Sequence, residues 1–378
     1  MSNPHPSILH ISTAKTWRGG EQQLTYLYEE LYANNIQQTL LCVKNSALEQ
    51  YFVSKAYKCY SVRKGSNINF LFARKVREVC KEHEIDIIHV HDSHALSFAL
   101  LAANFFGNNI PVVVSRRVDF PIKSRRKYNH PNIRKILCVS DAIREITGRD
   151  IANKSVLQTV HSGIDLDRFR AGGEFRILRE EYNIPPDIKL IGNVAALAPH
   201  KDYFTFLDTA ELLLKENLQA RFFVIGEGKL GDQLRRYAQN RGLNEHVTFT
   251  GFRDDISQIL PELDLFLITS ETEGFGTTIL DAFACRVPVV ATNAGGISEI
   301  VDNEITGILG GVKQPETLAA GVKRLLADES LRASIVAKAY EKVGSFTKEV
   351  MADKTLKVYE EIFSGDNESS SKMTGSQA

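Results

Sequence analysis

The sequence lacks any long apolar run and is poor in cysteine. None of its apolar stretches approaches the roughly 18 residues that a membrane-spanning helix requires. Its opening residues lack the basic and apolar pattern of a secretory signal peptide. The five cysteines are odd in number, widely spaced and without a Cys-x-x-Cys pair, so we expect reduced thiols. These absences predict a cytoplasmic protein, either free or peripheral on the inner face of the membrane.

A net charge of either sign is also missing. Lys plus Arg and Asp plus Glu each number 46, so the overall charge indicates no polyanionic partner, and we expect no nucleic acid. No Gly-x-Gly-x-x-Gly follows the first expected strand, which disfavours a dinucleotide-binding dehydrogenase. Apolar content of 43% and charged content of 24% are ordinary for a globular protein. The length of 378 residues predicts two or three domains.

Short β-prone runs alternate with helical patterns along the whole chain. This alternation predicts the α/β class, with parallel sheets covered by helices on both faces. The pattern lapses between Val160 and Gly173, which include three glycines and no periodicity, so we expect the hinge there. We predict two doubly wound, Rossmann-like domains, 1–165 and 166–345, that face a cleft. Residues 364–378 are polar and without aromatics, and we predict a disordered tail.

The most informative motif is Glu-Gly-Phe-Gly-Thr-Thr-Ile-Leu-Asp at 273–281. It follows an apolar run at 263–269 and continues with helical spacing, so the order is strand, loop, helix. Its glycines let the loop approach a ligand, and the unpaired N–H groups at the helix start favour a phosphate. We predict a nucleotide-activated sugar here, although a tight turn alone would also explain the pattern. Glu273 is a predicted catalytic residue, and the predicted donor contacts are Gly274, Phe275, Gly276, Thr277, Thr278 and Asp281.

Four further loops follow expected strands. The loop within 191–202 places Lys201 at a helix start, where it can neutralise a diphosphate as a predicted catalytic residue or merely be solvated. Glycine turns at 224–228 and 247–253 are weaker signals. Near the chain start, Trp-Arg-Gly-Gly-Glu at 17–21 lets the backbone approach a phosphate or the acceptor, with a plain turn as the alternative. The donor contacts predicted from the glycine loops are Gly19, Gly20, Gly226, Gly251 and Phe252.

These motifs together resemble the retaining glycosyltransferases of family four, group 1, which have the GT-B fold. The family signature is two glutamates with seven residues between them, and here Asp281 stands in the second place. The resemblance implies that Glu273 contacts the donor sugar and Asp281 the ribose. It also implies a last helix, 346–363, that crosses back to the first domain. The stretch 292–299 resembles a Gly-Gly-x-Pro-Glu turn of the family and implies a loop that shapes the pocket.

The diphosphate loop departs from the family pattern. There an arginine accompanies the lysine on the diphosphate, and Ala196 occupies the place of that arginine. Because charge stabilisation is often the largest catalytic contribution, we expect His200, Arg253 or another cation to substitute, or the donor to bind differently.

The resemblance implies transfer of a sugar from a UDP- or GDP-linked donor to a hydroxyl of a glycan or lipid-linked acceptor, without a further cofactor. The implied context is polysaccharide or lipopolysaccharide assembly. Two other classes stay open. One is a degenerate protein that binds sugar nucleotide without turnover, and the other is a nucleotide-sugar epimerase or a phosphorylase on the same scaffold.

Two histidines end a strand pattern in the first domain. Alternation places His89 and His91 on one face of that strand. A metal site would need more ligands in good geometry, so we predict no required metal. The resemblance implies that His91 is catalytic and orients the substrate; the alternative is a half-buried histidine whose hydrogen bonds are satisfied.

Residues 116–135 are strongly basic. They hold eight basic residues against Asp119 alone, a net formal charge of +7, with aromatic residues between them. A solvated loop is the simplest interpretation. The sharper hypothesis is a patch that binds anionic lipid headgroups or a phosphate-bearing acceptor. The predicted patch residues are Arg116, Arg117, Lys123, Arg125, Arg126 and Lys127.

Overall fold

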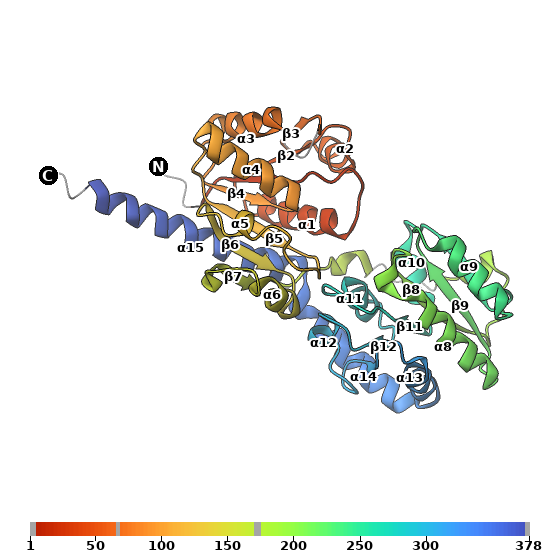
Figure 1. Ribbon diagram of the computed structural model, residues 1–378. Coiled ribbons are helices and arrows are strands. Elements are labelled where there is room, and N and C mark those ends of the chain that lie inside the picture. The colour runs from red at the N-terminus through yellow and green to blue at the C-terminus, as the bar shows by residue number, and fades with distance from the viewer. Residues whose placement is uncertain (1–4, 66–68, 170–174, 375–378) are drawn as a thin grey trace. The chain divides into compact units, whose positions relative to one another are not determined.

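The computed structural model describes residues 5–65, 69–169 and 175–374 (Figure 1). Contacts within the chain divide it into two compact units. Unit 1 comprises Met1–Gly163 and Lys348–Ala378, and unit 2 comprises Ile164–Thr347. The boundary that we expected, between residues 165 and 166, falls beside this division.

Unit 1 is built on a parallel sheet of seven strands in the order β3-β2-β1-β4-β5-β6-β7. Strands β1, β2 and β4 are buried along their whole length, as in a sheet that helices cover on both faces. The strands are β1 (Ile8–Ile11), β2 (Gln38–Val43), β3 (Cys59–Val62), β4 (Ile87–Val90), β5 (Val112–Arg116), β6 (Ile133–Cys138) and β7 (Leu157–Thr159). The helices are α1 (Gly19–Ala33), α2 (Ala47–Ser54), α3 (Phe70–Glu82), α4 (Ser93–Phe106), α5 (Arg125–Tyr128), α6 (Asp141–Gly148) and α15 (Lys348–Thr374).

Unit 2 is built on a second parallel sheet, of six strands in the order β10-β9-β8-β11-β12-β13. The strands are β8 (Lys189–Val194), β9 (Ala220–Ile225), β10 (Val247–Gly251), β11 (Leu265–Ile268), β12 (Val289–Thr292) and β13 (Ile308–Gly310). The helices are α7 (Ile177–Glu181), α8 (Tyr203–Lys215), α9 (Gly231–Asn240), α10 (Ile256–Ile259), α11 (Thr277–Ala284), α12 (Ile297–Ile300), α13 (Pro315–Ala327) and α14 (Glu329–Val343). Short 3₁₀ turns include η2 (Leu166–Phe169) and η3 (Pro199–Lys201).

The strand order reverses once in each sheet, between β1 and β4 in unit 1 and between β8 and β11 in unit 2. Ligands of doubly wound sheets bind at the carboxyl ends of the strands beside such a switch point. All strand pairs run parallel, so the loops that follow them in each unit gather at one edge of its sheet. The structure confirms the predicted α/β class with two doubly wound parallel sheets.

The last helix returns the chain to unit 1. Helix α15 packs on α1, and Met351 and Tyr359 are buried in the same cluster as Ile8 and Leu27. This is the crossover that the resemblance implied. Among the described residues, no helix combines the length and the apolar character that spanning a membrane takes.

The predicted end of this helix is wrong. We placed it at residue 363 and expected a disordered tail over 364–378, but α15 continues to Thr374. Starting a helix is costly, whereas extending one that already exists adds a hydrogen bond for each residue fixed. The polar composition after residue 363 therefore did not stop the helix. Residues 375–378 lie outside the described residues.

Candidate functional site

The loop between β11 and α11 has the strand, loop and helix order that the sequence predicts. Glu273 lies in this loop, and Gly276 precedes the helix with φ of +93°, a left-handed conformation that a side chain would strain. The first N–H groups of α11 have no partner inside the helix and point along its axis. Thr277 and Thr278 form the first turn, and Asp281 follows one turn later. A phosphate placed before Thr277 would meet these N–H groups.

The Phe275 side chain anchors this loop instead of facing a ligand. It is 3% exposed, and its ring centroid lies 5.6 Å from that of Phe346. Phe275 is one of the predicted donor contacts, and because its side chain is buried, only its backbone is available for that contact. Gly274, Thr277 and Thr278 are partly exposed.

The loop that follows β12 packs against the backbone of Glu273. The N–H of Gly296 donates to the carbonyl oxygen of Glu273 at 2.9 Å. Gly295 has φ of +53°, and a Cβ added to it would lie 2.2 Å from the same carbonyl oxygen. A Cβ on Gly296 would lie 2.5 Å from the carbonyl oxygen of Gly274. The pair of glycines is therefore needed for close backbone packing that holds the 273–276 loop in place.

Lys201 and Glu273 meet although 72 residues separate them in sequence. The ammonium of Lys201 donates to Oε2 of Glu273 in an ion pair, and Ser270 Oγ lies 3.4 Å from the same oxygen. The two side chains are only 18% and 12% exposed, so water screens the pair weakly. A backbone bond from Glu271 to the carbonyl of His200, at 2.8 Å, fixes one loop on the other. The structure thus brings the two predicted catalytic residues of unit 2 together at the switch point.

A cavity of about 600 Å³ opens at the carboxyl ends of β8, β9 and β10. Its volume lies within the range of small-molecule sites. Gly226 has φ of +137°, and a Cβ there would lie 2.2 Å from the carbonyl oxygen of Ala195, so only glycine fits. Phe252 is 72% exposed beside Gly251, and its N–H donates to Glu227 Oε1 at 3.3 Å. The lining residues are Leu197, Gly226, Glu227, Gly228, Lys229, Gly231, Asp232, Arg235 and Gly251.

Asp281 is a carboxyl group held away from water. Burial raises its pKa to about 7, and the positive charge of Arg168 in η2 opposes part of this rise. Cys285, one turn further along α11, has its pKa raised to about 12 by burial and by the Asp281 carboxylate. A ligand hydroxyl that donates to Asp281 would favour its ionised form and lower this pKa.

The candidates for the missing arginine differ in their surroundings. Arg253 donates to Asp255 at 2.6 Å and to Glu181 at 2.7 Å, so two carboxylates already neutralise it. Lys229 and Arg235 line the cavity beside β9 and β10. No sequence motif indicates these two cations, because Lys229 lies in a loop and Arg235 in α9, outside the motifs.

In unit 1, Gly19 and Gly20 form the first turn of α1, and a Cβ on either would meet nothing within 4 Å. The Glu21 carboxylate accepts a hydrogen bond from the N–H of Arg18 at 3.0 Å. Burial raises the pKa of Glu21, although the charge of Arg117 counteracts this. Both positions are therefore open, and a donor contact at Gly19 and Gly20 stays a prediction.

His91 belongs to a buried histidine cluster at the carboxyl edge of the unit 1 sheet. His10 lies in β1, His89 lies in β4, and His91 directly follows β4. One ring nitrogen of each of the three histidines lies within 4.8 Å of those of the other two. His10 Nδ1 lies 3.0 Å from His91 Nε2, while His89 Nδ1 lies 2.5 Å from the Tyr359 hydroxyl. Sequence reasoning missed His10, although a histidine inside a short buried strand was a usable signal.

Three neutral histidines can hold a metal, but a guanidinium stands beside them. Burial lowers the pKa of His91 well below its ordinary value, and His89 and Arg117 lower it further through their charges. The pKa of His89 is lowered in the same way. The positive field that suppresses protonation also opposes a bound cation. The absence of a required metal stays a prediction.

The basic segment does not form one continuous patch. Arg116 is 5% exposed, and its guanidinium contacts the carbonyl of Phe120 and lies over that ring, 5.0 Å from the centroid. Lys127 Nζ donates to the carbonyl and the hydroxyl of Ser93 in α4, at 2.5 and 2.7 Å. Arg117 is half-buried. The exposed residues of the predicted patch are Lys123, Arg125 and Arg126.

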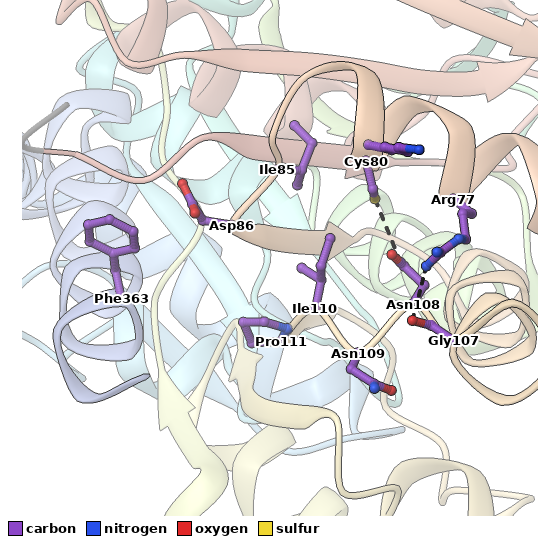
Figure 2. Close-up of a pocket in the computed structure, with 11 residues that line it drawn as sticks. Arg77, Cys80, Ile85, Asp86, Gly107, Asn108, Asn109, Ile110, Pro111 and Phe363 are labelled. Atoms are coloured by element: carbon purple, nitrogen blue, oxygen red, sulfur yellow. Dashed lines mark hydrogen bonds between the residues drawn. The ribbon is translucent and has the colours of Figure 1, made fainter. Parts of the chain in front are cut away.

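Another cavity of unit 1, of about 570 Å³, lies at the opposite edge of its sheet (Figure 2). Asp86 and Pro111, which precede β4 and β5, line it, with Phe363 of α15 on one side. Arg77 donates to the carbonyl of Gly107 at 3.0 Å, and Asn108 is turned toward Cys80. This cavity is therefore separate from the residues that follow β4 and β5.

Comparisons with known proteins agree with these features. The family model described as glycosyl transferases group 1 matches residues 174–342, and the model of glycosyltransferase family 4 matches residues 17–168. N-acetyl-alpha-D-glucosaminyl L-malate synthase of Bacillus anthracis is 26% identical over 83% of this chain and 83% of its own length. The UDP-Gal:alpha-D-GlcNAc-diphosphoundecaprenol alpha-1,3-galactosyltransferase of Escherichia coli is 22% identical over 88% of this chain and 91% of its own.

Solved structures share the fold at low sequence identity. The Anabaena protein HepE, crystallised with UDP and glucose, superposes with a TM-score of 0.82 at 20% identity, covering 94% of this chain and 99% of that one. A glycosyltransferase from Rickettsia africae superposes with a TM-score of 0.84 at 20% identity, covering 95% and 98%. At this identity the likeness shows the two-domain fold alone.

Proposed function

This chain belongs to the group 1 glycosyltransferases of family 4, and on that premise we propose that it transfers a sugar from a nucleotide-diphosphate donor to a hydroxyl of a glycan or lipid-linked acceptor, with retention of anomeric configuration. The observation that supports this donor most strongly is the Lys201–Glu273 ion pair beside the N-terminus of α11. It combines a cation, a carboxylate and helix N–H groups at the switch point of one sheet, where such sheets bind ligands.

The proposed division of roles follows from charge. The departing diphosphate gains negative charge in the transition state, and Lys201 and the first N–H groups of α11 stabilise it. Glu273 holds donor sugar hydroxyls and keeps the Lys201 ammonium in place before the donor arrives. Asp281 accepts from the ribose hydroxyls. The departing phosphate oxygen takes the acceptor proton on the same face, and His91 orients the substrate.

The cavity of about 600 Å³ is the proposed place of the nucleotide base, which is UDP- or GDP-derived. Its backbone walls at Gly226 and Gly251 suit recognition through N–H and carbonyl groups. Lys229 and Arg235 are the proposed replacements for the missing arginine, since Arg253 is neutralised by two carboxylates.

For the acceptor, two of the names above give different chemistries: the Bacillus anthracis relative makes a malate product, and the Escherichia coli relative acts on a diphosphoundecaprenol-linked sugar. We propose a glycan or lipid-linked acceptor here, with the protein cytoplasmic and peripheral on the membrane. Lys123 and Arg126 are exposed beside Phe120, which is 50% exposed, so charge and an apolar ring are both available to an anionic surface. Arg125 is exposed as well, but its Nε donates to Asp150 at 2.7 Å.

The first test uses Glu273→Gln and Lys201→Ala with a panel of nucleotide sugars. Removing a group that stabilises transition-state charge costs roughly a hundredfold to a thousandfold in turnover, and we expect losses of that size. Lys215→Ala is the matched control, because Lys215 and Glu211 form an ion pair with Lys215 68% exposed in α8 of the same unit. Turnover within a few-fold of the parent in both site variants would refute the assignment. Stabilisation by a donor without product release would instead indicate binding without turnover.

A further inference from the structure

We propose that Arg117 is an oxyanion-binding residue of unit 1 that recognises a carboxylate or phosphate on the acceptor, while His91 accepts a hydrogen bond from a hydroxyl of the same ligand. This rests on the proposed function, because it names the chemical class of the acceptor. It starts from three buried side-chain nitrogens that have no hydrogen-bond partner among the described residues. They are Nε and Nη1 of Arg117 and Nδ1 of His91.

The topology places these two side chains at one edge of the sheet. His91 follows β4 and Arg117 follows β5, and the two strands pair in parallel, with His89 opposite Val113. The edge lies beside the switch point, since His91 also donates its N–H to the carbonyl of Ile11 at the end of β1. Arg117 and His89 line the same small cavity, so the guanidinium lies near the His89 ring. Its charge contributes to the lowered pKa of both His89 and His91.

Leaving these nitrogens unpaired is costly. A buried N–H without a partner loses its bonds to water and gains none in return, and the loss is larger for a charged group. Burial accordingly lowers the pKa of Arg117 to about 10, against the opposing charge of Glu21. Folds retain such a group where a ligand supplies the missing partner.

A single water cannot pair all the unpaired N–H groups on Nε and Nη1 of Arg117. Arg117, His89 and Ser115 line a cavity of about 20 Å³, which has room for a single water. That water accepts two hydrogen bonds, whereas Nε and Nη1 of a guanidinium carry three N–H groups. The neighbours Gln23 and His89 are already engaged, with Gly163 and with Ser115. Arg117 is only half-buried as a residue, so a ligand can approach its side chain at the sheet edge and must enter the space beside the buried Nε and Nη1.

The carboxylate whose charge acts on the guanidinium, that of Glu21, already accepts from the N–H of Arg18 at 3.0 Å. Asp92, whose charge acts on Glu21, is occupied as well. Asp92 accepts from the N–H and the hydroxyl of Thr13, at 2.5 and 2.7 Å, and from the N–H groups of His94 and Ala95, each at 2.9 Å. A carboxylate or phosphate matches the planar arrangement of guanidinium N–H groups, and such an oxyanion would supply the missing hydrogen-bond acceptors.

A chain of hydrogen bonds sets the tautomer of His91. The amide nitrogen of Gln38 donates to the carbonyl of Tyr28 at 2.6 Å, so its Oε1 faces His10 Nε2, 3.2 Å away, and accepts from it. His10 Nδ1 then carries a lone pair and accepts from His91 Nε2–H at 3.0 Å. The neutral His91 ring therefore presents a lone pair at Nδ1. That nitrogen accepts a hydrogen bond from a hydroxyl and repels an oxyanion, so the oxyanion binds to Arg117 instead.

The test is differential scanning fluorimetry of the full chain with inorganic phosphate, acetate and glycolate, each titrated with and without saturating UDP or GDP. The variants are Arg117→Gln, Arg117→Lys and His91→Phe. The matched control is Arg74→Gln, because Arg74 lies on the exposed face of α3 with its guanidinium on Glu78. We expect the anions to stabilise the parent and Arg74→Gln saturably in the presence of the nucleotide. Whichever of phosphate and acetate binds more tightly identifies the acceptor group.

We expect Arg117→Gln to weaken the apparent anion affinity by about tenfold or more, because each hydrogen bond to a charged group has roughly that weight. Arg117→Lys keeps the charge without the fork and should fall between. Glycolate should bind more tightly than acetate, and His91→Phe should remove that difference. Without ligand, Arg117→Gln should melt no lower than the parent.

An unchanged anion response in Arg117→Gln, or its loss when the nucleotide is saturating, would overturn the proposal; the second result would assign the anion to the donor site. A lower melting temperature of ligand-free Arg117→Gln would also contradict it, since the guanidinium would then have partners within the fold. If neither UDP nor GDP stabilises the parent, the proposed function fails, and the anion titrations still decide this inference separately.

Discussion

Replacing Gly295 by alanine should disable the donor site while leaving the protein folded. A Cβ at this position would lie 2.2 Å from the carbonyl oxygen of Glu273, so the 273–276 loop must move by roughly 1 Å to restore an ordinary contact. A displacement of about 1 Å at reacting groups costs on the order of a hundredfold in rate. We expect turnover to fall by about that factor, with the donor KM raised as well.

Gly242→Ala is the matched control for this prediction. Gly242 has φ of +70°, comparable with +53° at Gly295, but a Cβ there would meet nothing within 4 Å. Both variants should lose about 1–2 kcal/mol of unfolding free energy from the left-handed backbone. Steady-state transfer kinetics and thermal melting of the two variants separate strain from displacement. The reasoning is refuted if Gly295→Ala turns over within a few-fold of the parent, or if Gly242→Ala loses as much activity.

Three further predictions concern other parts of the chain. Asp281, whose pKa burial raises to about 7, should accept from ribose more strongly when ionised, so donor affinity should fall as the pH drops below about 7, and Asp281→Asn should abolish that dependence. Because the folded pKa lies above the ordinary 3.8, this carboxyl adds stability at low pH that is lost as the pH rises toward about 7; denaturation of Asp281→Asn across that window should show a flatter profile. Tyr359→Phe removes the partner of His89 Nδ1, 2.5 Å away and buried, and should cost roughly 1–3 kcal/mol in urea unfolding; a loss below about 0.5 kcal/mol would show that the bond is unimportant for docking α15. Joint substitution of Lys123, Arg125 and Arg126 by Gln should weaken binding to phosphatidylserine vesicles by about 1 kcal/mol per residue, and equal flotation of variant and parent would remove these residues from a membrane role.

Local order could be predicted from the sequence because it depends on short windows. The apolar run before Glu273 and the helical spacing after Ile279 define a strand, loop and helix without knowledge of the rest of the chain. The same holds for the alternation that defines two parallel sheets. The end of α15 was not predictable in this way, since helix extension depends on the helix already formed and only weakly on local polarity.

Contacts between loops could not be predicted, because they depend on strand order. Lys201 meets Glu273 only because β8 and β11 are neighbours across the switch point of the sheet. His10 joins His91 because β1 pairs with β4, placing His10 opposite His89. Arg117 looked like one charge among eight in a basic segment, and its burial beside two histidines became visible only once β5 was placed next to β4.

The most direct test of the donor site follows the backbone amides of Gly276, Thr277 and Thr278 by ¹⁵N–¹H NMR during titration with UDP or GDP, whichever stabilises the protein, and with the matching nucleoside. If the diphosphate binds at the N-terminus of α11, the nucleotide will shift these three amides strongly and the nucleoside, which lacks phosphates, will leave them in place. Saturating nucleotide binding with all three amides unmoved, or equal shifts with the nucleoside, would contradict the account.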